Sequence, residues 1–172
     1  MFDTSYPVRY IHHTTLPGSP YTDHLLTFTC RFNHKYLIHV EEYAHLVFGV
    51  KFHLKAHQDS NRRYSLLTKF NDTPRVLATI VQAMKLFETK HPLATFAFFG
   101  AELEGESVDN TKRFRVYKPI MENFFEEALY DHQYLKPESF YLILNKEHKQ
   151  QNPALYPYIL EQFKALVKKP EE

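Results

Sequence analysis

The hydrophobic periodicity of this chain changes near residue 70, and this change constrains the fold more than any other feature. Before that point, apolar residues alternate with polar ones, as in strands with one buried face. After it, apolar residues recur at spacings of three and four, as along one side of a helix. A series of strands followed by alternating helices and strands is the order of an α+β protein. The predicted fold class is therefore α+β.

The first part of the chain is predicted to form an antiparallel β-meander of about five strands. Turn-forming residues interrupt the alternation around Gly18, at Asn33 and at residues 58–61. The predicted strands cover residues 6–16, 24–32, 35–41, 45–57 and 62–70.

The second part is predicted to continue as helix, strand, helix, strand, helix. Asp72 can cap the first helix with Pro74 in its first turn, and His91 and Pro92 end it. Residues 94–99 and 140–144 are short apolar runs typical of buried strands. The remaining helices are expected from residue 110 or 111 to 125 and over residues 152–166. Together these elements predict one domain, residues 1–172, with a single layer of helices packed on a sheet.

Composition agrees with a globular protein that lies in the cytoplasm. Hydrophobic residues make up 44% of the chain and charged residues 24%, which is an ordinary globular balance. The single cysteine, Cys30, lies in an alternating run, and a buried free thiol in a reducing compartment is expected. The first residues lack a basic segment followed by an apolar run, and no apolar stretch approaches the length of a membrane span. The sequence thus predicts a cytoplasmic protein that does not engage a membrane.

Residues 74–117 resemble an uncharacterised family of small bacterial cytoplasmic proteins, a domain of unknown function. The resemblance rests on residues 76–80, on Phe87 before His91, on the strand that ends in Gly100, and on residues 113–117. It implies a bacterial cytoplasmic protein and no activity. In this chain Ala101 and an acidic run follow Gly100, where the family has a small hydroxyl residue. This departure argues against a phosphate-cradling role for Gly100.

A cluster of cations at the start of the second predicted helix is the sharpest local signal. The helix dipole disfavours cations at this end, so an anion is expected nearby. The acidic residues 102–109 could supply it, or a phosphate could be held by backbone N–H groups with Arg113 and Arg115. The predicted anion site consists of Thr111, Lys112, Arg113, Arg115 and Tyr117.

The polar face of the predicted meander is a second candidate site. If Val50, Phe52 and Leu54 point to the core, alternation places Lys51, His53 and Lys55 on the opposite face. A cationic sheet face can hold single-stranded nucleic acid. The isoelectric point of about 7.9 instead favours an ordinary solvated face.

These features lead to a functional hypothesis with two alternatives. The hypothesis is a non-enzymatic binding or regulatory module for an anionic ligand, nucleic acid or nucleotide. The alternatives are a protein–protein interaction module that docks through exposed aromatic residues, and a nuclease in which Glu102 and Glu104, with Asp72 or Asp109, bind Mg²⁺. No catalytic residue or cofactor is assigned, because the sequence contains no nucleophile-elbow, phosphate-loop or dinucleotide-binding motif. No metal ligand is assigned, because His53 and His57 would lie about 13 Å apart along a strand.

Overall fold

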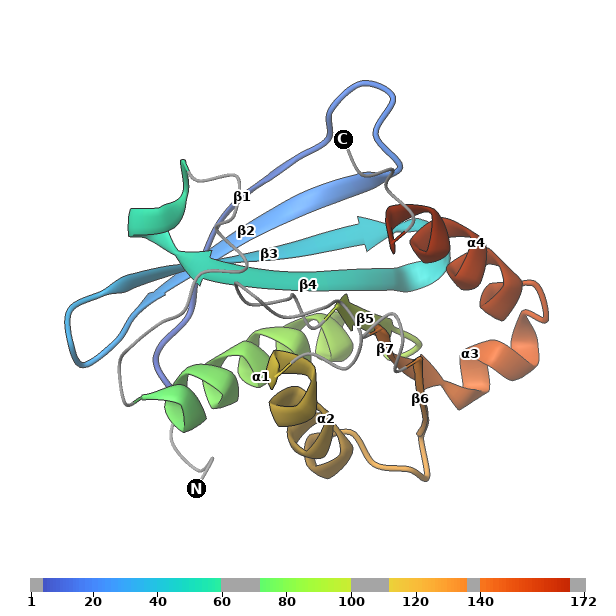
Figure 1. Cartoon of the computed structure of the whole chain (residues 1–172). Coiled ribbons are helices and arrows are strands. Elements are labelled where there is room, and N and C mark those ends of the chain that lie inside the picture. The colour runs from blue at the N-terminus through green and yellow to red at the C-terminus, as the bar shows by residue number, and fades with distance from the viewer. Residues whose placement is uncertain (1–4, 60–71, 100–111, 136–139, 168–172) are drawn as a thin grey trace.

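The computed structural model describes residues 5–59, 72–99, 112–135 and 140–167, with residues 73, 99, 112–117, 135 and 164–167 described by their backbone alone. Within these residues the chain forms a seven-stranded sheet in the order β1-β2-β3-β4-β5-β7-β6, with helices on both faces (Figure 1). The α+β class predicted from the sequence is confirmed. No helix in these ranges is both long enough and apolar enough to cross a membrane.

The elements follow one another in a simple order. The strands are β1 (Arg9–Thr14), β2 (Tyr21–Thr29), β3 (Lys35–Tyr43), β4 (Val47–Leu54), β5 (Thr95–Phe99), β6 (Tyr130–Leu135) and β7 (Phe140–Asn145). The helices are α1 (Thr73–Lys90), α2 (Lys112–Phe124), α3 (Lys146–Gln151) and α4 (Leu155–Val167). Two short 3₁₀ helices, η1 (Ala44–Leu46) and η2 (Lys55–His57), flank β4.

The predicted meander is present as β1 to β4, four consecutive antiparallel strands. Its turns use backbone conformations with positive φ, at Gly18 (77°) and at Asn33 (60°), two residue types that tolerate the left-handed region. The predicted strand at 45–57 is shorter in the structure, because the chain turns into η1 before it and into η2 after it. The fifth predicted strand, residues 62–70, lies outside the described residues.

Helix α1 connects β4 to β5, which pair in parallel, and a parallel pair requires such a crossover. The helix begins at Thr73 with Pro74 in its first turn, and it ends where the His91 N–H donates to the Phe87 carbonyl at 2.8 Å. Strands β7 and β6 then add antiparallel to β5. Strand β6 is absent from the predicted element order, because the polar residues Asp131, His132 and Gln133 stand at its centre and leave no apolar run or apolar alternation.

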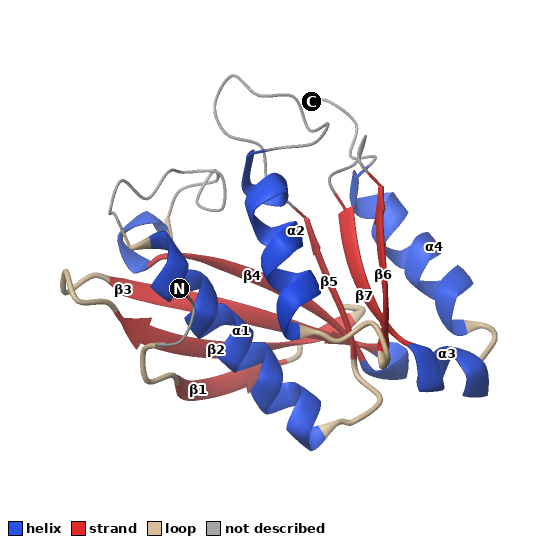
Figure 2. Ribbon diagram, turned by 90° about the horizontal axis from the view of Figure 1, so that it is seen from below, coloured by secondary structure: helices blue, strands red, loops and turns tan. Residues whose placement is uncertain are grey.

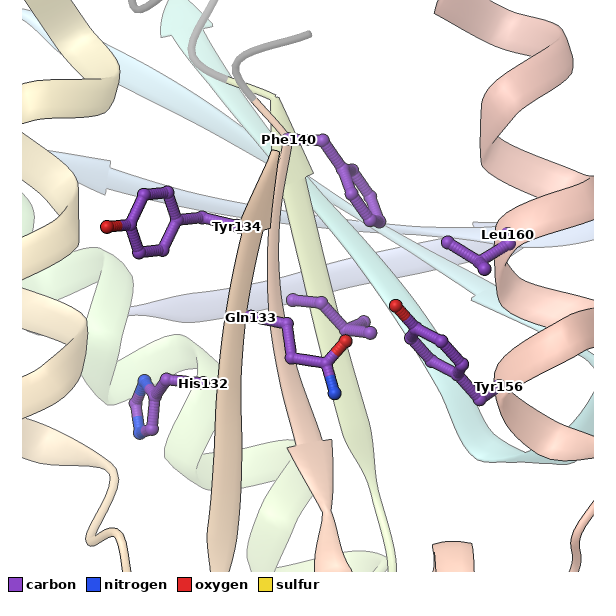
Figure 3. A pocket seen from close by; sticks show the side chains of 7 residues that line it. His132, Gln133, Tyr134, Phe140, Tyr156 and Leu160 are labelled. Atoms are coloured by element: carbon purple, nitrogen blue, oxygen red, sulfur yellow. The ribbon is translucent and has the colours of Figure 1, made fainter. Parts of the chain in front are cut away.

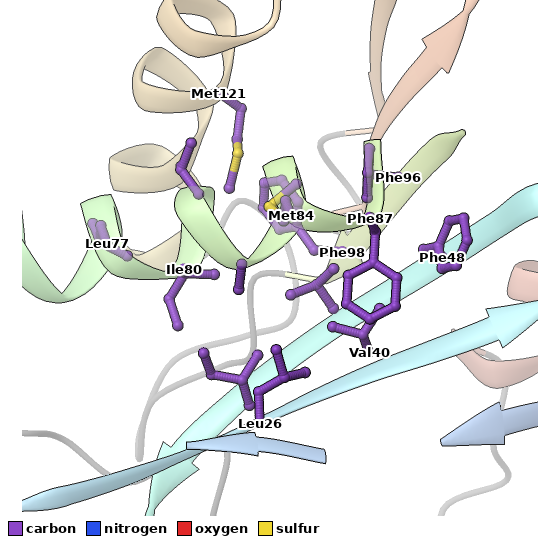
Figure 4. Packing of buried hydrophobic residues seen from close by; sticks show 14 of the residues in the cluster. Leu26, Val40, Phe48, Leu77, Ile80, Met84, Phe87, Phe96, Phe98 and Met121 are labelled. Carbon is purple, nitrogen blue, oxygen red and sulfur yellow. The ribbon is translucent and has the colours of Figure 1, made fainter. Parts of the chain in front are cut away.

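One face of the sheet packs against α1 and α2. Along α1, Leu77, Ile80 and Met84 repeat at helical spacing and belong to one buried cluster with Leu26 and Phe48 of the sheet. Ile80 points at the strands, and Met84 lies near Met121 of α2 (Figure 4). Aromatic rings make much of this contact. The rings of Phe48 and Phe87 lie 5.4 Å apart, and Phe48 and Phe96 lie 5.8 Å apart. The apolar stripe predicted for this helix is therefore its core-facing side.

The opposite face packs against α4, so the predicted single layer of helices is wrong. Leu155, Ile159 and Phe163 of α4 contact a second apolar cluster that includes Phe140 and Leu142 of β7. Every residue of β7 is buried, and alternate side chains point to opposite faces, so this strand needs cover on both sides. Figure 2 shows α1 and α2 in front of the strongly twisted sheet, with α3 and α4 beside β6 and β7.

Candidate functional site

Five ionisable side chains gather on the sheet face opposite α1. Val40 points to the α1 side, so the neighbouring residues on β3, His39 and Glu41, point to the other side. The strand register places His39 opposite Lys51, and the same face receives one residue from β2 and a second from β4. We call this group the sheet-face cluster: Asp23, His39, Glu41, Lys51 and His53.

A chain of hydrogen-bonding contacts runs through the cluster from Asp23 to the end of β4. The Asp23 Oδ2 atom lies 2.9 Å from His39 Nδ1, and His39 Nε2 lies 3.3 Å from His53 Nε2. On the far side, His53 Nδ1 lies 2.8 Å from the carbonyl oxygen of Leu54. The two imidazole rings therefore point their Nε2 atoms at each other, and each Nδ1 atom is held by an acceptor oxygen.

The carboxylate of Glu41 forms the second half of the cluster. Glu41 is buried, and Lys51 Nζ lies 3.4 Å from each of its two carboxylate oxygens. The Tyr43 hydroxyl donates to Glu41 Oε1 at 3.2 Å, and burial together with this negative charge raises the pKa of Tyr43 well above its usual range. A Cβ on Gly49 would lie 3.4 Å from Glu41 Oε1 and from the Tyr43 ring, which is an ordinary van der Waals distance, so Gly49 packs directly under this pair.

This geometry changes the picture of a basic sheet face. Lys51 and His53 do lie on one face of β4, but His53 is buried and Lys51 forms an ion pair with Glu41. Lys55 does not continue the row as predicted, because β4 ends at Leu54 and Lys55 belongs to η2. Acidic Asp23 and Glu41 share the face, so it is of mixed charge. Whether these residues bind a ligand stays a prediction.

The start of α2 matches the predicted helix start in its backbone. The helix begins at Lys112 and has no acidic residue in its first turn. Thr111 and the side chains of residues 112–117 lie outside the description, and so does the acidic run at 102–109. The ion pair of Lys118 with Glu122, at 2.9 Å, is the first described side-chain contact along the helix.

The carboxylate of Asp72, which the nuclease hypothesis needs for Mg²⁺, is buried and engaged. It accepts a hydrogen bond from the Tyr6 hydroxyl at 2.5 Å, and Arg31 Nε lies 3.6 Å from its other oxygen. The other residues of that hypothesis, Glu102, Glu104 and Asp109, lie outside the described residues. In the described part of the chain, no group of three or more His, Cys, Asp or Glu side chains is arranged to hold a metal ion.

A groove of about 360 Å³ lies at the other end of the sheet, between β6, β7 and α4. Figure 3 shows Gln133, Phe140, Tyr156 and Leu160 on one side of the two strands, with the His132 and Tyr134 side chains on the other. The wall is mostly apolar, and Gln133 and Tyr156 bring an amide and a hydroxyl to it. The Gln133 amide donates to Asp131 Oδ2 at 2.7 Å. Strand β6 ends the strand order of the described sheet, so this groove borders a sheet edge.

The sequence showed only part of both sites. Alternation along β4 identified Lys51 and His53, whereas Asp23, His39 and Glu41 join them through cross-strand register. Aligning the alternating residues of β2 with β3, and of β3 with β4, across their turns could have identified these partners. The groove depends on β6, which the sequence pattern does not predict, and on the packing of α4 against the second face of the sheet.

Comparisons with protein-family models, with curated proteins and with solved structures found no match for this chain.

Proposed function

We propose that this protein is a non-enzymatic binding module whose ligand is an extended segment of another polypeptide, bound in the groove beside β6. The observation that carries the proposal is the groove itself, with the apolar side chains of Phe140, Leu142 and Leu160 and the amphipathic ring of Tyr156. Concave, largely apolar surfaces with a few polar groups are the usual form of a binding site. This form supports the protein–protein alternative of the sequence analysis.

The position of the groove at a sheet edge favours an extended ligand. An edge strand presents backbone N–H and C=O groups to its open side, and a peptide can add there as a further strand. Alternate side chains of such a peptide would then enter the groove, while the Gln133 amide and the Tyr156 hydroxyl would fix its orientation. Lys149, which lies 3.6 Å from Asp131 and 5.8 Å from the centre of the Tyr156 ring, would border the bound segment.

Selection of a displayed random peptide library on the purified protein tests this function. We expect enriched peptides with alternating apolar residues, and we expect Tyr156→Ala to weaken their binding at least tenfold, because aromatic anchors dominate the energetics of such contacts. Tyr158→Ala is the matched control on the same helix, since the Tyr158 ring packs on His45, 4.9 Å away, and is not part of the groove. Peptides that bind equally well to both variants, or no enrichment at all, would contradict the proposal.

An anionic ligand at the start of α2 is the second candidate, and one observation favours it. The helix begins at Lys112 and carries cations, without an acidic residue, in its first turn. Cations are disfavoured there by the helix dipole, so a nearby anion would relieve the repulsion. A nucleotide or a single-stranded nucleic acid would supply phosphate to the helix N–H groups and to Arg113 and Arg115.

The double variant Arg113→Ala, Arg115→Ala is expected to weaken binding of a labelled single strand or a nucleotide by about 2 to 5 kcal/mol, since each charge-assisted hydrogen bond contributes roughly 1.5 to 3 and neighbouring contributions add incompletely. Titration at two salt concentrations separates the ligands, because log K for a single strand falls by about 0.7 per phosphate contact for each unit of log[salt]. Lys35→Ala with Lys90→Ala is the control, as both lysines are exposed on other elements. If the arginines instead pair with the acidic run, the double variant will alter stability by about a kilocalorie or less and will change no binding.

A further inference from the structure

We propose that His39 and His53 form a binding site for a divalent transition-metal ion of the zinc type, which their two Nε2 atoms coordinate. The proposal is independent of the function proposed above, since the two rings lie on the sheet face of β3 and β4 and the groove lies beside β6. The spacing of His53 and His57 along one strand predicted no metal site. The relevant pair spans two strands.

The acceptors around the two rings fix where their protons lie. A backbone carbonyl can only accept, so the contact of His53 Nδ1 with the Leu54 carbonyl at 2.8 Å places a hydrogen on Nδ1. The Asp23 carboxylate does the same for His39 Nδ1 at 2.9 Å. In the neutral state, each ring then carries its lone pair on Nε2. Metal-binding histidines characteristically donate their other N–H to a carboxylate or a carbonyl, and here the pair shows one of each.

The separation of the two Nε2 atoms suits two ligands of one ion. At 3.3 Å they lie close to the separation of about 3.3 to 3.4 Å between neighbouring ligands of a tetrahedral ion with Zn–N bonds of about 2.0–2.1 Å. The ring planes differ by 19°, and the ring centres lie 5.4 Å apart, so neither ring turns its face to the other nitrogen. Two neutral rings in this tautomer would bring their two Nε2 lone pairs together, and the lone pairs would repel each other. A cation bound by both nitrogen atoms removes this repulsion.

The electrostatic surroundings also favour a cation. Among the described residues, the charged groups of the cluster nearest the pair are the carboxylates of Asp23 and Glu41 and the ammonium of Lys51, and Arg9, His12 and Lys35 lie on the same face in more distant register positions. The carboxylate of Asp23, 2.9 Å from His39 Nδ1, is the negative charge in direct contact with the pair and favours a cation on the other ring nitrogen. His53 is buried, which strengthens these interactions, whereas the His39 side chain is 20% exposed and gives an ion a route from solvent. Water completes the coordination shell at the positions that the described side chains do not occupy.

A single proton shared by the two rings is the competing occupant. It would make one ring an imidazolium that donates to the other, and 3.3 Å is at the long end for such a bond. A metal ion and a shared proton compete for the same two nitrogen atoms, so added metal must displace the proton. Metal binding at this site should therefore weaken as the pH is lowered.

The test is a titration of the metal-free full chain with Zn²⁺, followed by calorimetry and by metal analysis after dialysis. We expect one ion per chain, a higher melting temperature in Zn²⁺ than in Mg²⁺, and weaker binding at lower pH. Asp23→Asn should lower the affinity about 10- to 100-fold, as second-layer substitutions do, and His39→Gln and His53→Gln should lower it further. Replacing both exposed histidines of β1, His12→Gln with His13→Gln, should leave the titration unchanged.

A spectroscopic measurement on the unaltered protein keeps the test decisive if a cluster variant fails to fold. Long-range ¹H–¹⁵N NMR spectra of the histidine rings should show both His39 and His53 as Nδ1–H tautomers. Zn²⁺ should shift their Nε2 resonances together. The absence of saturable binding, binding lost only in the His12 and His13 variant, or unchanged His39 and His53 resonances in Zn²⁺ would each overturn the proposal.

Discussion

The variant Leu77→Asp is expected to yield little folded protein. Leu77 is 4% exposed and belongs to the buried cluster that α1 forms with α2 and the sheet (Figure 4). An unpaired carboxylate in this position costs several kcal/mol, a large part of the 5 to 15 kcal/mol that typically separates a folded domain from its unfolded state. Soluble yield and far-ultraviolet circular dichroism measure the loss.

Leu86→Asp is the matched control for that variant. It makes the same substitution on the same helix, but Leu86 is 55% exposed, so its carboxylate would remain in water. We expect a change in stability within about 0.5 kcal/mol, as for other surface substitutions. If Leu77→Asp melts at the wild-type temperature, the orientation of α1 described above is wrong.

Helix α1 shows which parts of this fold were predictable from the sequence. Its apolar stripe depends on a period of 3.6 residues within one element, and its members Val76, Leu77 and Ile80 are buried as the pattern predicts. The four strands of the meander were predictable for the same reason, since alternation is also a local property. The ends of the elements were less predictable, because η1 and η2 shorten β4 and the alternation does not indicate these turns.

Strand β7 explains why the arrangement of the helices was not predicted. Its apolar run signals burial on both faces, but that run does not say which helix covers which face. Only the packing of Leu155 and Ile159 on the second face shows that α4 lies opposite α1. Strand β6 carried even less signal, since Asp131 and His132 interrupt any apolar pattern.

Only part of the sheet-face cluster could be predicted from the sequence, because the cluster depends on the register between neighbouring strands. His39 and His53 meet because η1 joins β3 to β4 with positive φ at His45 and Leu46, both close to 60°. A positive φ is uncommon for residues other than glycine, so the sequence does not predict this turn. A turn that shifted β4 by one residue against β3 would send His53 to the face opposite His39. The alternation along β4 alone therefore predicted a basic face, whereas the register of the sheet gives a cluster of mixed charge.

The free energy of unfolding is expected to fall steeply as the pH rises above about 10. Tyr43, Tyr130 and Tyr141 are almost fully buried, and burial raises the pKa of all three above the usual tyrosine range. Glu41 adds to this effect at Tyr43, and Glu88 adds to it at Tyr130, whose hydroxyl donates to the carboxylate at 2.5 Å. The native state therefore keeps these three protons at a pH where the unfolded chain releases them.

The sign and size of the effect follow from proton linkage. A raised native pKa gives stability that is complete below the unfolded pKa of about 10 and is lost as the pH rises toward the higher native value. Each such tyrosine lowers the free energy of unfolding by about 1.4 kcal/mol per pH unit, so three together give a slope of about 4 kcal/mol per pH unit. Urea unfolding at several pH values between about 9 and 11 measures it, and tyrosinate absorbance should appear together with unfolding.

The variant Tyr43→Phe separates this mechanism from general alkaline damage. Phenylalanine cannot ionise, so we expect the slope above about pH 10 to fall by roughly one third, or 1.4 kcal/mol per pH unit. At neutral pH the same change removes the hydrogen bond to Glu41 and should lower stability by about 1 kcal/mol. Tyr156→Phe is the control, because Tyr156 is half-buried at the groove and not in the core. An equal slope in Tyr43→Phe and the wild type, or tyrosinate absorbance from all three residues before unfolding, would show that burial does not hold these protons.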